Sequence, residues 1–265
     1  MISTFSVFLF LVILLLIAVF VGWSIRTRRK MQLIHKLYLA ISILYAVWLI
    51  ALLCMYFTDP GNTPMLFVWD AVTNSAGAFL PALSLCITVC FVKNYTHMPR
   101  RGWMVFIIPI ISNLVIWTNP IFHLQYRVFS VIRSEIVFGP YIVVSGMYSY
   151  ICLATGILLM LNFARKNRSR LYTIQCTLFA LGTLSPLAVS TISTLTDSLP
   201  ITATPISFIP TILLSGIAIY RFHMLDIKPI ATQHVLDWIS DWYLVISDTG
   251  LVISYNRPFA NVFAS

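Results

Sequence analysis

A small set of polar residues in this sequence has the types and spacing to hold a ligand. Asp70 and Asn74 are four positions apart, a spacing that places both side chains on one face of a helix. His123, Tyr126 and Glu135 lie in one polar stretch, residues 118–139. A few polar anchors next to an apolar cavity are the usual composition of a small-molecule pocket. These residues are therefore the candidate ligand-binding site.

Each of these residues also has an explanation that involves no ligand. A carboxylate favours a helix N-terminus, so Asp70 is also expected as the cap of a helix that begins at residue 71. Asn74 suits a hydrogen bond between neighbouring helices. The aromatic residues of 118–139 suit a belt at a membrane interface, and a lid over a ligand is the alternative.

Catalytic and metal-binding patterns are missing from the sequence. The cysteines all fall in apolar runs, where small buried side chains are expected: Cys54, Cys86, Cys90, Cys152 and Cys176. None has metal-ligand spacing, and the ten glycines are scattered with no GxxxxGK[ST] loop. We expect no catalytic residue, metal or cofactor in this chain.

The composition indicates what positions these residues. Of the 265 residues, 59% are hydrophobic and 9% are charged, and the mean hydropathy is +0.90. A soluble domain has about a quarter of its residues charged, so this is a membrane protein. The net charge of +9 needs no nucleic-acid partner, because membrane proteins collect Lys and Arg in their cytoplasmic loops.

Seven apolar runs are long enough to cross a bilayer, which takes about 20 helical residues. They are residues 5–25, 37–57, 71–92, 103–117, 141–163, 171–195 and 201–220. None contains Asp, Glu, Lys or Arg, in keeping with a cost on the order of 3 kcal/mol for a central charge. The predicted fold class is an all-α membrane protein, a seven-transmembrane helix bundle.

The loop charges predict the orientation. Arg127 and Arg133 are the exceptions among 17 basic residues; all the others fall on one side of the predicted spans. The positive-inside rule makes that side cytoplasmic and places the N-terminus outside. The first run is followed, not preceded, by a basic cluster, so it is expected to be a retained helix and not a cleaved signal peptide.

The last part of the chain has a different character. Residues 242–247 and 251–255 are β-rich runs separated by the turn Asp248-Thr249-Gly250, a pattern that predicts a hairpin. A lone hairpin is marginal in water, so we expect the front of a larger α/β domain that is truncated here. The predicted organisation is a membrane domain at 1–225, a linker helix at 226–241 and this hairpin at 242–265.

The hairpin and its junction with the membrane domain carry a resemblance. Residues 245–252, followed by Tyr255-Asn256-Arg257-Pro258-Phe259, resemble the opening of a PAS domain, and residues 221–229 join it to the spans. The whole resembles the seven-transmembrane sensor region of bacterial histidine kinases, which implies two-component signal transduction. The resemblance implies a multi-pass protein of the bacterial cell membrane, a homodimer in the lipid bilayer, with an unknown small-molecule stimulus and a cytoplasmic output module.

The sequence also bears on other functions of multi-pass membrane proteins. None of the five histidines is followed by Asp or Glu, as a phosphoacceptor histidine would be, so no kinase activity is expected in this chain. A diguanylate cyclase output remains an alternative to the kinase. A retinal protein is excluded because residues 201–220 contain no Lys. A small-molecule transporter stays open because prolines interrupt several spans, although no span carries a charge.

Overall fold

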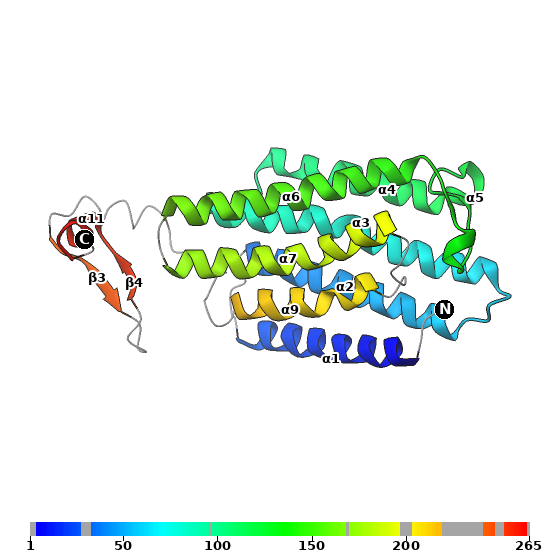
Figure 1. The fold of residues 1–265 in the computed structure, drawn as a ribbon, viewed down its shortest axis with the longest axis horizontal. Helices are drawn as coiled ribbons and strands as arrows, with labels where there is room; N and C mark the ends of the chain where they lie inside the picture. The colour runs from blue at the N-terminus through cyan, green and yellow to red at the C-terminus, as the bar shows by residue number, and fades with distance from the viewer. Residues whose placement is uncertain are drawn as a thin grey trace.

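The computed structural model describes residues 4–27, 33–95, 97–167, 170–196, 203–218, 241–246 and 252–263. In these residues the chain forms a bundle of long helices, followed in sequence by a small hairpin (Figure 1). The bundle helices are α1 Thr4–Thr27, α2 Leu33–Phe57, α3 Thr63–Lys93, α4 Ile107–Trp117, α6 Tyr141–Asn167, α7 Arg170–Thr196, α8 Ala203–Ile206 and α9 Phe208–Gly216.

Six helical segments of the described chain are long and apolar enough to cross a membrane. They are Thr4–Arg26, Leu33–Phe57, Thr63–Lys93, Arg100–Trp117, Tyr141–Asn167 and Arg170–Ile192. They coincide with the first six predicted runs, which confirms an all-α, multi-pass membrane protein. The seventh run is present as the shorter apolar helix Ala203–Gly216. Its predicted ends lie outside the described residues, so a seventh full span stays a prediction.

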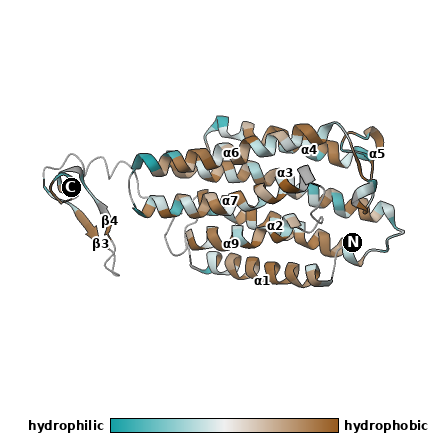
Figure 2. Ribbon diagram, viewed as in Figure 1, coloured by the Kyte–Doolittle hydropathy of each residue, from teal (hydrophilic) through white to brown (hydrophobic). Residues whose placement is uncertain are grey.

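Apolar residues dominate the bundle helices along most of their length (Figure 2), and many of their large side chains are exposed. Phe5, Leu15 and Leu158 are among the large apolar side chains that are more than 60% exposed. In water such a surface would be a large aggregation-prone patch. In a bilayer the same side chains meet lipid, which is the environment that the hydropathy of these helices predicts.

The helix α3 begins two turns earlier than predicted. Asn62 is its N-cap, and the Asn62 side chain accepts a hydrogen bond from the Met65 amide at 3.2 Å. The prediction that Asp70 caps this helix is therefore wrong, because Asp70 lies inside it. A tertiary contact holds the extra turns, in which Trp69 Nε1 donates to Thr58 Oγ1 at 3.1 Å.

The fourth segment is irregular at its start. Arg100–Phe106 forms the 3₁₀ helix η1, which leads directly into α4. Pro109 is the third residue of α4, where its missing N–H removes no helical hydrogen bond. The Tyr148 hydroxyl of α6 donates to the Val105 carbonyl and so fixes η1 to the bundle.

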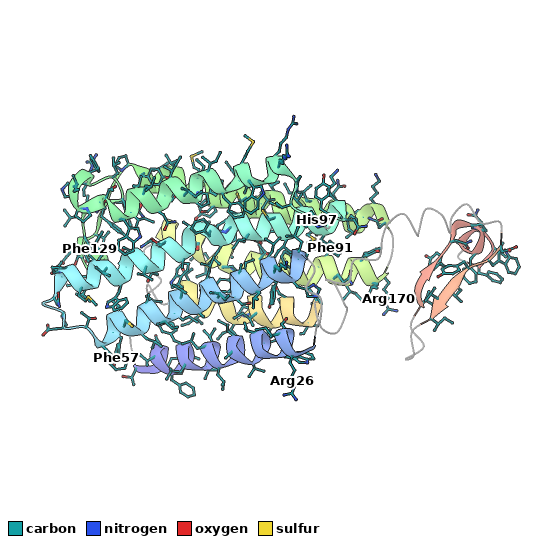
Figure 3. All side chains as sticks on the ribbon, turned by 180° about the vertical axis from the view of Figure 1, so that it is seen from behind. Arg26, Phe57, Phe91, His97, Phe129 and Arg170 are labelled. Atoms are coloured by element: carbon teal, nitrogen blue, oxygen red, sulfur yellow. The ribbon has the colours of Figure 1, made fainter. Side chains whose placement is uncertain are left out.

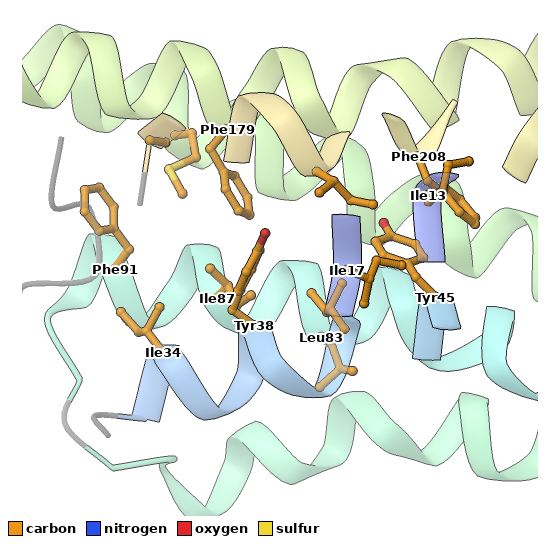
Figure 4. Close-up of a cluster of buried hydrophobic side chains, with 14 of the residues drawn as sticks. Ile13, Ile17, Ile34, Tyr38, Tyr45, Leu83, Ile87, Phe91, Phe179 and Phe208 are labelled. Atoms are coloured by element: carbon orange, nitrogen blue, oxygen red, sulfur yellow. The ribbon is translucent and has the colours of Figure 1, made fainter. Parts of the chain in front are cut away.

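The bundle core lies where α1, α2, α3, α6, α7 and α9 meet, and Figure 4 shows part of it. The Tyr45 and Phe208 rings have centroids 4.2 Å apart, and the Trp48 ring meets Phe208 edge-on at 5.3 Å. Gly77 of α3 allows this arrangement, because a Cβ there would lie 2.8 Å from the Trp48 ring. The backbone of α3 therefore approaches α2 closely beside the aromatic cluster.

The two ends of the bundle carry different loops. Arg26, His97 and Arg170 lie at one end, and Phe57 and Phe129 lie at the other (Figure 3). The first end holds the loops predicted to be cytoplasmic, and the second holds 118–139. The loops that the charge count assigns to opposite sides of the membrane thus lie at opposite ends of the bundle.

The C-terminal hairpin is confirmed. Strand β3, Leu244–Ile246, pairs antiparallel with β4, Val252–Tyr255, and helix α11, Arg257–Phe263, follows. The helix was not expected. Buried Asn256 produces it, since its Oδ1 accepts from the Phe259 amide at 3.2 Å and from the Tyr243 amide at 3.0 Å. The predicted turn at 248–250 and nearly all of the predicted linker helix at 226–241 lie outside the described residues.

Candidate ligand-binding cavity

The stretch 118–139 forms a cap over one end of the bundle; we name it the outer loop after the side that the loop charges predict for it. It contains the short helix α5, Asn119–Phe122, and the antiparallel strands β1, Tyr126–Val128, and β2, Val137–Phe138, with the single 3₁₀ turn η2, Arg133–Glu135, between them. The aromatic residues of this stretch thus sit on a compact hairpin, and their role as an interfacial belt or as a lid stays a prediction. Tyr126 is 7% exposed, so at least this aromatic side chain points into protein.

Two local features fold the outer loop back onto itself. Buried Asn119 accepts the Gln125 and Tyr126 amides through Oδ1, at 2.8 and 2.9 Å. Gly139 donates its amide to the Gln125 carbonyl at 2.8 Å. A Cβ at Gly139 would lie 2.1 Å from the Leu124 carbonyl oxygen, so only glycine permits this backbone approach.

The fold brings three of the predicted site residues together. Asn74 Nδ2 donates to Asp70 Oδ2 at 3.0 Å and lies 3.3 Å from the Tyr126 hydroxyl. The Tyr126 side chain is also hydrogen-bonded to the Asp70 carboxylate. This triad ties the outer loop to α3. The same-face placement of Asp70 and Asn74, expected from their spacing, is confirmed.

The environment keeps the Tyr126 phenol protonated. Burial, and next the negative charge of Asp70, raise the pKa of Tyr126 well above its ordinary value. The phenol is therefore a hydrogen-bond donor at every physiological pH. Donation to Asp70 is the bond that a carboxylate partner requires, since an ionised carboxylate can only accept.

The remaining two predicted residues lie away from the triad. His123 is exposed at the end of α5, with a left-handed backbone (φ 51°). Glu135 is exposed and accepts a hydrogen bond from Ser130 at 2.7 Å within the outer loop. Neither lines the cavity described next. Their role in ligand binding stays a prediction.

A cavity of about 1200 Å³ runs through the bundle beneath the outer loop. Its lining comes from α2, α3, α4, α6, α7, α8, α9 and the loop itself. Along α2 the lining residues run from Tyr38 to Tyr56, a length of about 27 Å at 1.5 Å per residue. Asp70, Asn74 and Tyr126 lie at the outer end of this cavity.

Most of the cavity wall is apolar in effect, although it carries hydroxyl groups. Ser42, Thr73 and Thr183 each donate to the carbonyl four residues earlier in their own helix, at 3.0, 2.8 and 2.9 Å. Thr211 of α9 donates to the Gly182 carbonyl of α7 at 2.8 Å. Hydroxyls bonded in this way present mainly their carbon atoms to the cavity.

Gln125 is a cavity residue that sequence reasoning missed. It is 3% exposed and lines the cavity, and its Oε1 accepts no hydrogen bond from the described residues. A lone glutamine in a loop gives no periodic signal. The nearest sequence signal is its position directly before Tyr126, in a loop already singled out.

The arrangement of polar and apolar groups in the cavity is suited to binding a small molecule. Among the described residues, no group of three or more His, Cys, Asp or Glu side chains is placed to hold a metal ion. Among the described lining residues, Asp70 is the one with a formal charge. A long apolar cavity with its polar groups gathered at one end is the usual design of a small-molecule site.

Fold and cavity together define a multi-pass α-helical membrane protein with an internal ligand-sized cavity. The family of N-terminal 7TM regions of histidine kinases matches residues 6–229, which include all of the bundle except the first two residues of α1. The chain belongs to this family. No curated protein matches the chain. The hairpin β3–β4 lies beyond the matched residues, so it rests on the sequence and the structure alone.

Proposed function

We propose that this chain is the signal-sensing region of a bacterial sensor histidine kinase and that the cavity is its stimulus site. The observation that carries the proposal is the triad of Asp70, Asn74 and Tyr126, which joins the outer loop to α3 at the mouth of the cavity. His123 and Glu135 belong to the proposed site as exposed loop residues, which a ligand arriving from outside meets first.

The packing of the helices supports a route from the cavity to the cytoplasmic side. Helix α3 contacts α2, α4 and α6, then α6 contacts α7, and α7 contacts α9. Helix α9 is the last described helix before the C-terminal segment. A ligand shifts such a system only when it binds one helix arrangement more tightly than another. A ligand that replaces the bond between Asp70 and Tyr126 would make that difference where the outer loop meets α3.

The C-terminal segment supports a cytoplasmic PAS domain as the receiver. The hairpin β3–β4 is followed by α11, and Asn256 holds the two together through Tyr243 and Phe259. A hairpin of this size is marginal alone. We propose that a complete PAS domain and the kinase output are encoded further along the gene, in a homodimer.

The proposal requires the orientation that the loop charges predict, in the bacterial cell membrane. Single-cysteine variants in a background lacking the native cysteines test it. Asn62→Cys should react with an impermeant maleimide in intact cells, and Asn167→Cys should react only after permeabilisation. Both residues are exposed. Labelling of Asn167→Cys in intact cells would reverse the orientation.

The experiment for the function uses the full-length gene product in native membranes. Asp70→Asn, Asn74→Leu and Tyr126→Phe should each change autophosphorylation from ATP more than they change the amount of protein in the membrane. The matched control is Asp59→Asn, an exposed acid at the same end of the bundle, whose Oδ1 accepts the Gly61 amide at 2.7 Å. If all three site variants behave like the control, the stimulus site lies elsewhere.

A further inference from the structure

At the outer end of the cavity, hydrogen-bond acceptors outnumber the donors that reach them. Gln125 Oε1 is buried and accepts no hydrogen bond within the described chain. A buried acceptor without a hydrogen bond is unfavourable, because it has lost its bonds to water. The Asp70 carboxylate accepts bonds from Asn74 and Tyr126. Two carboxylate oxygens offer about four acceptor sites, so the capacity of Asp70 is not exhausted.

The donors at this end are already engaged with these acceptors. Asn74 Nδ2 and the Tyr126 hydroxyl both bond to Asp70, and the Gln125 side chain is hydrogen-bonded to Tyr126. The end of the cavity therefore presents spare acceptors and one negative charge. Its complement is a group that carries several N–H donors and a positive charge, because opposite charge and hydrogen bonding then act together.

The rest of the cavity complements an apolar chain. The lining extends about 27 Å along α2, close to the roughly 30 Å thickness of a bilayer core. An acyl chain of one leaflet spans about half of that thickness. Such a chain therefore fits along the cavity while its head group stays at the outer end.

The cavity also has a route from the membrane. Val143 and Met147 of α6 line it, and both side chains are also more than half exposed, as expected where the cavity opens between helices toward lipid. An amphiphile in the outer leaflet has its head near the depth of the triad and its tail beside α6. Entry then moves the tail from lipid into the cavity without passing the head group through the bilayer core.

From these observations we propose that the cavity binds an amphiphile with a primary ammonium head and an apolar tail, the ammonium contacting Asp70 and Gln125. This inference rests on the proposed function for its role as a stimulus, but the binding itself does not depend on signalling. The same chemistry is offered by a free long-chain amine and by the ethanolamine head of an aminophospholipid.

Binding is measured with this chain in phosphatidylcholine nanodiscs, using tritiated dodecylammonium as the probe. Unlabelled dodecylammonium should compete at least tenfold better than dodecyltrimethylammonium, dodecanol or dodecanoate. Dodecyltrimethylammonium keeps the charge and lacks N–H donors, whereas dodecanol keeps a donor and lacks the charge. Equal competition by dodecanol would overturn the proposal, because the site would then select only the tail.

Two site variants and one control locate the head group. Asp70→Asn and Gln125→Met should each weaken probe binding, Asp70→Asn by about tenfold or more, as expected for loss of a charged hydrogen bond. Asp59→Asn should leave it unchanged. The thermal unfolding of each variant is recorded in parallel, so that misfolding is seen directly. Unchanged binding in a folded Asp70→Asn variant would overturn the assignment.

A second lipid composition separates the two sources. Replacing part of the phosphatidylcholine by phosphatidylethanolamine should displace the probe if the natural ligand is an aminophospholipid, and should leave probe binding unchanged if it is a free amine. Failure of binding alone would remove the ligand class and leave the sensor function standing. If the probe binds but does not change autophosphorylation of the full-length protein, the ligand class stands and the proposed sensor function is contradicted.

Discussion

The hydrogen bond between Tyr126 and Asp70 should decide how firmly the outer loop closes the cavity. Tyr126→Phe removes the hydroxyl and keeps the ring, with its contacts to Phe129 at 5.7 Å and Phe138 at 5.9 Å. A hydrogen bond to a charged group contributes about 1.5–3 kcal/mol. Each 1.4 kcal/mol is a factor of ten in an equilibrium constant, so loop opening should become about 10- to 150-fold more frequent.

Hydrogen–deuterium exchange of peptides from the outer loop measures this directly, because local opening sets the exchange of protected amides. The Gly139 amide, bonded to the Gln125 carbonyl, should lose protection by the same factor in Tyr126→Phe. Tyr95→Phe is the control, a half-exposed tyrosine after the end of α3 farthest from the loop. Identical exchange of the loop in both variants would refute the role given to this bond.

Two more predictions concern packing and the C-terminal hairpin. Gly77→Ala should lower the free energy of unfolding in detergent by about 1–3 kcal/mol, because its Cβ would lie 2.8 Å from the Trp48 ring. Gly146→Ala is the control, since its Cβ would have nothing within 4 Å. Equal melting temperatures of the two variants would contradict the close approach of α3 to α2. Asn256→Ala should speed amide exchange in β3 and α11, because it removes the acceptor for the Tyr243 and Phe259 amides. Asn261→Ala, at an exposed position of α11, is the control and should leave the exchange unchanged. Equal exchange in the two variants would contradict the capping role of Asn256.

The membrane class was predictable because its signal is spread over whole segments. Six runs of the predicted spans are helices in the structure, since a bilayer permits little other than a helix for such sequences. The start of α3 was missed because hydropathy falls at Asp70. Asn62 followed by Thr63-Pro64 is a helix N-terminus signal that was present in the sequence and outweighs hydropathy here.

The candidate site was predictable only where its geometry is local. Asp70 and Asn74 are neighbours because of helix periodicity, which a sequence shows. The arrival of Tyr126 at the same place depends on the fold of the outer loop around Asn119 and Gly139. Those contacts lie in an irregular loop, so they leave no periodic trace in the sequence. The separation of His123 and Glu135 from the cavity could not be predicted for the same reason.

The contents of the cavity are proposed to control the output, and a cavity-filling substitution tests this without knowledge of the ligand. Gly146 of α6 lines the cavity with no atom within 4 Å of its Cβ position, so Gly146→Trp places a large side chain in that space. Leu158→Trp puts the same side chain on the lipid-facing surface of the same helix. In the full-length protein, we predict a several-fold change in basal autophosphorylation for Gly146→Trp and none for Leu158→Trp, at equal protein levels in the membrane. Equal autophosphorylation in the two variants and the native protein would contradict the claim.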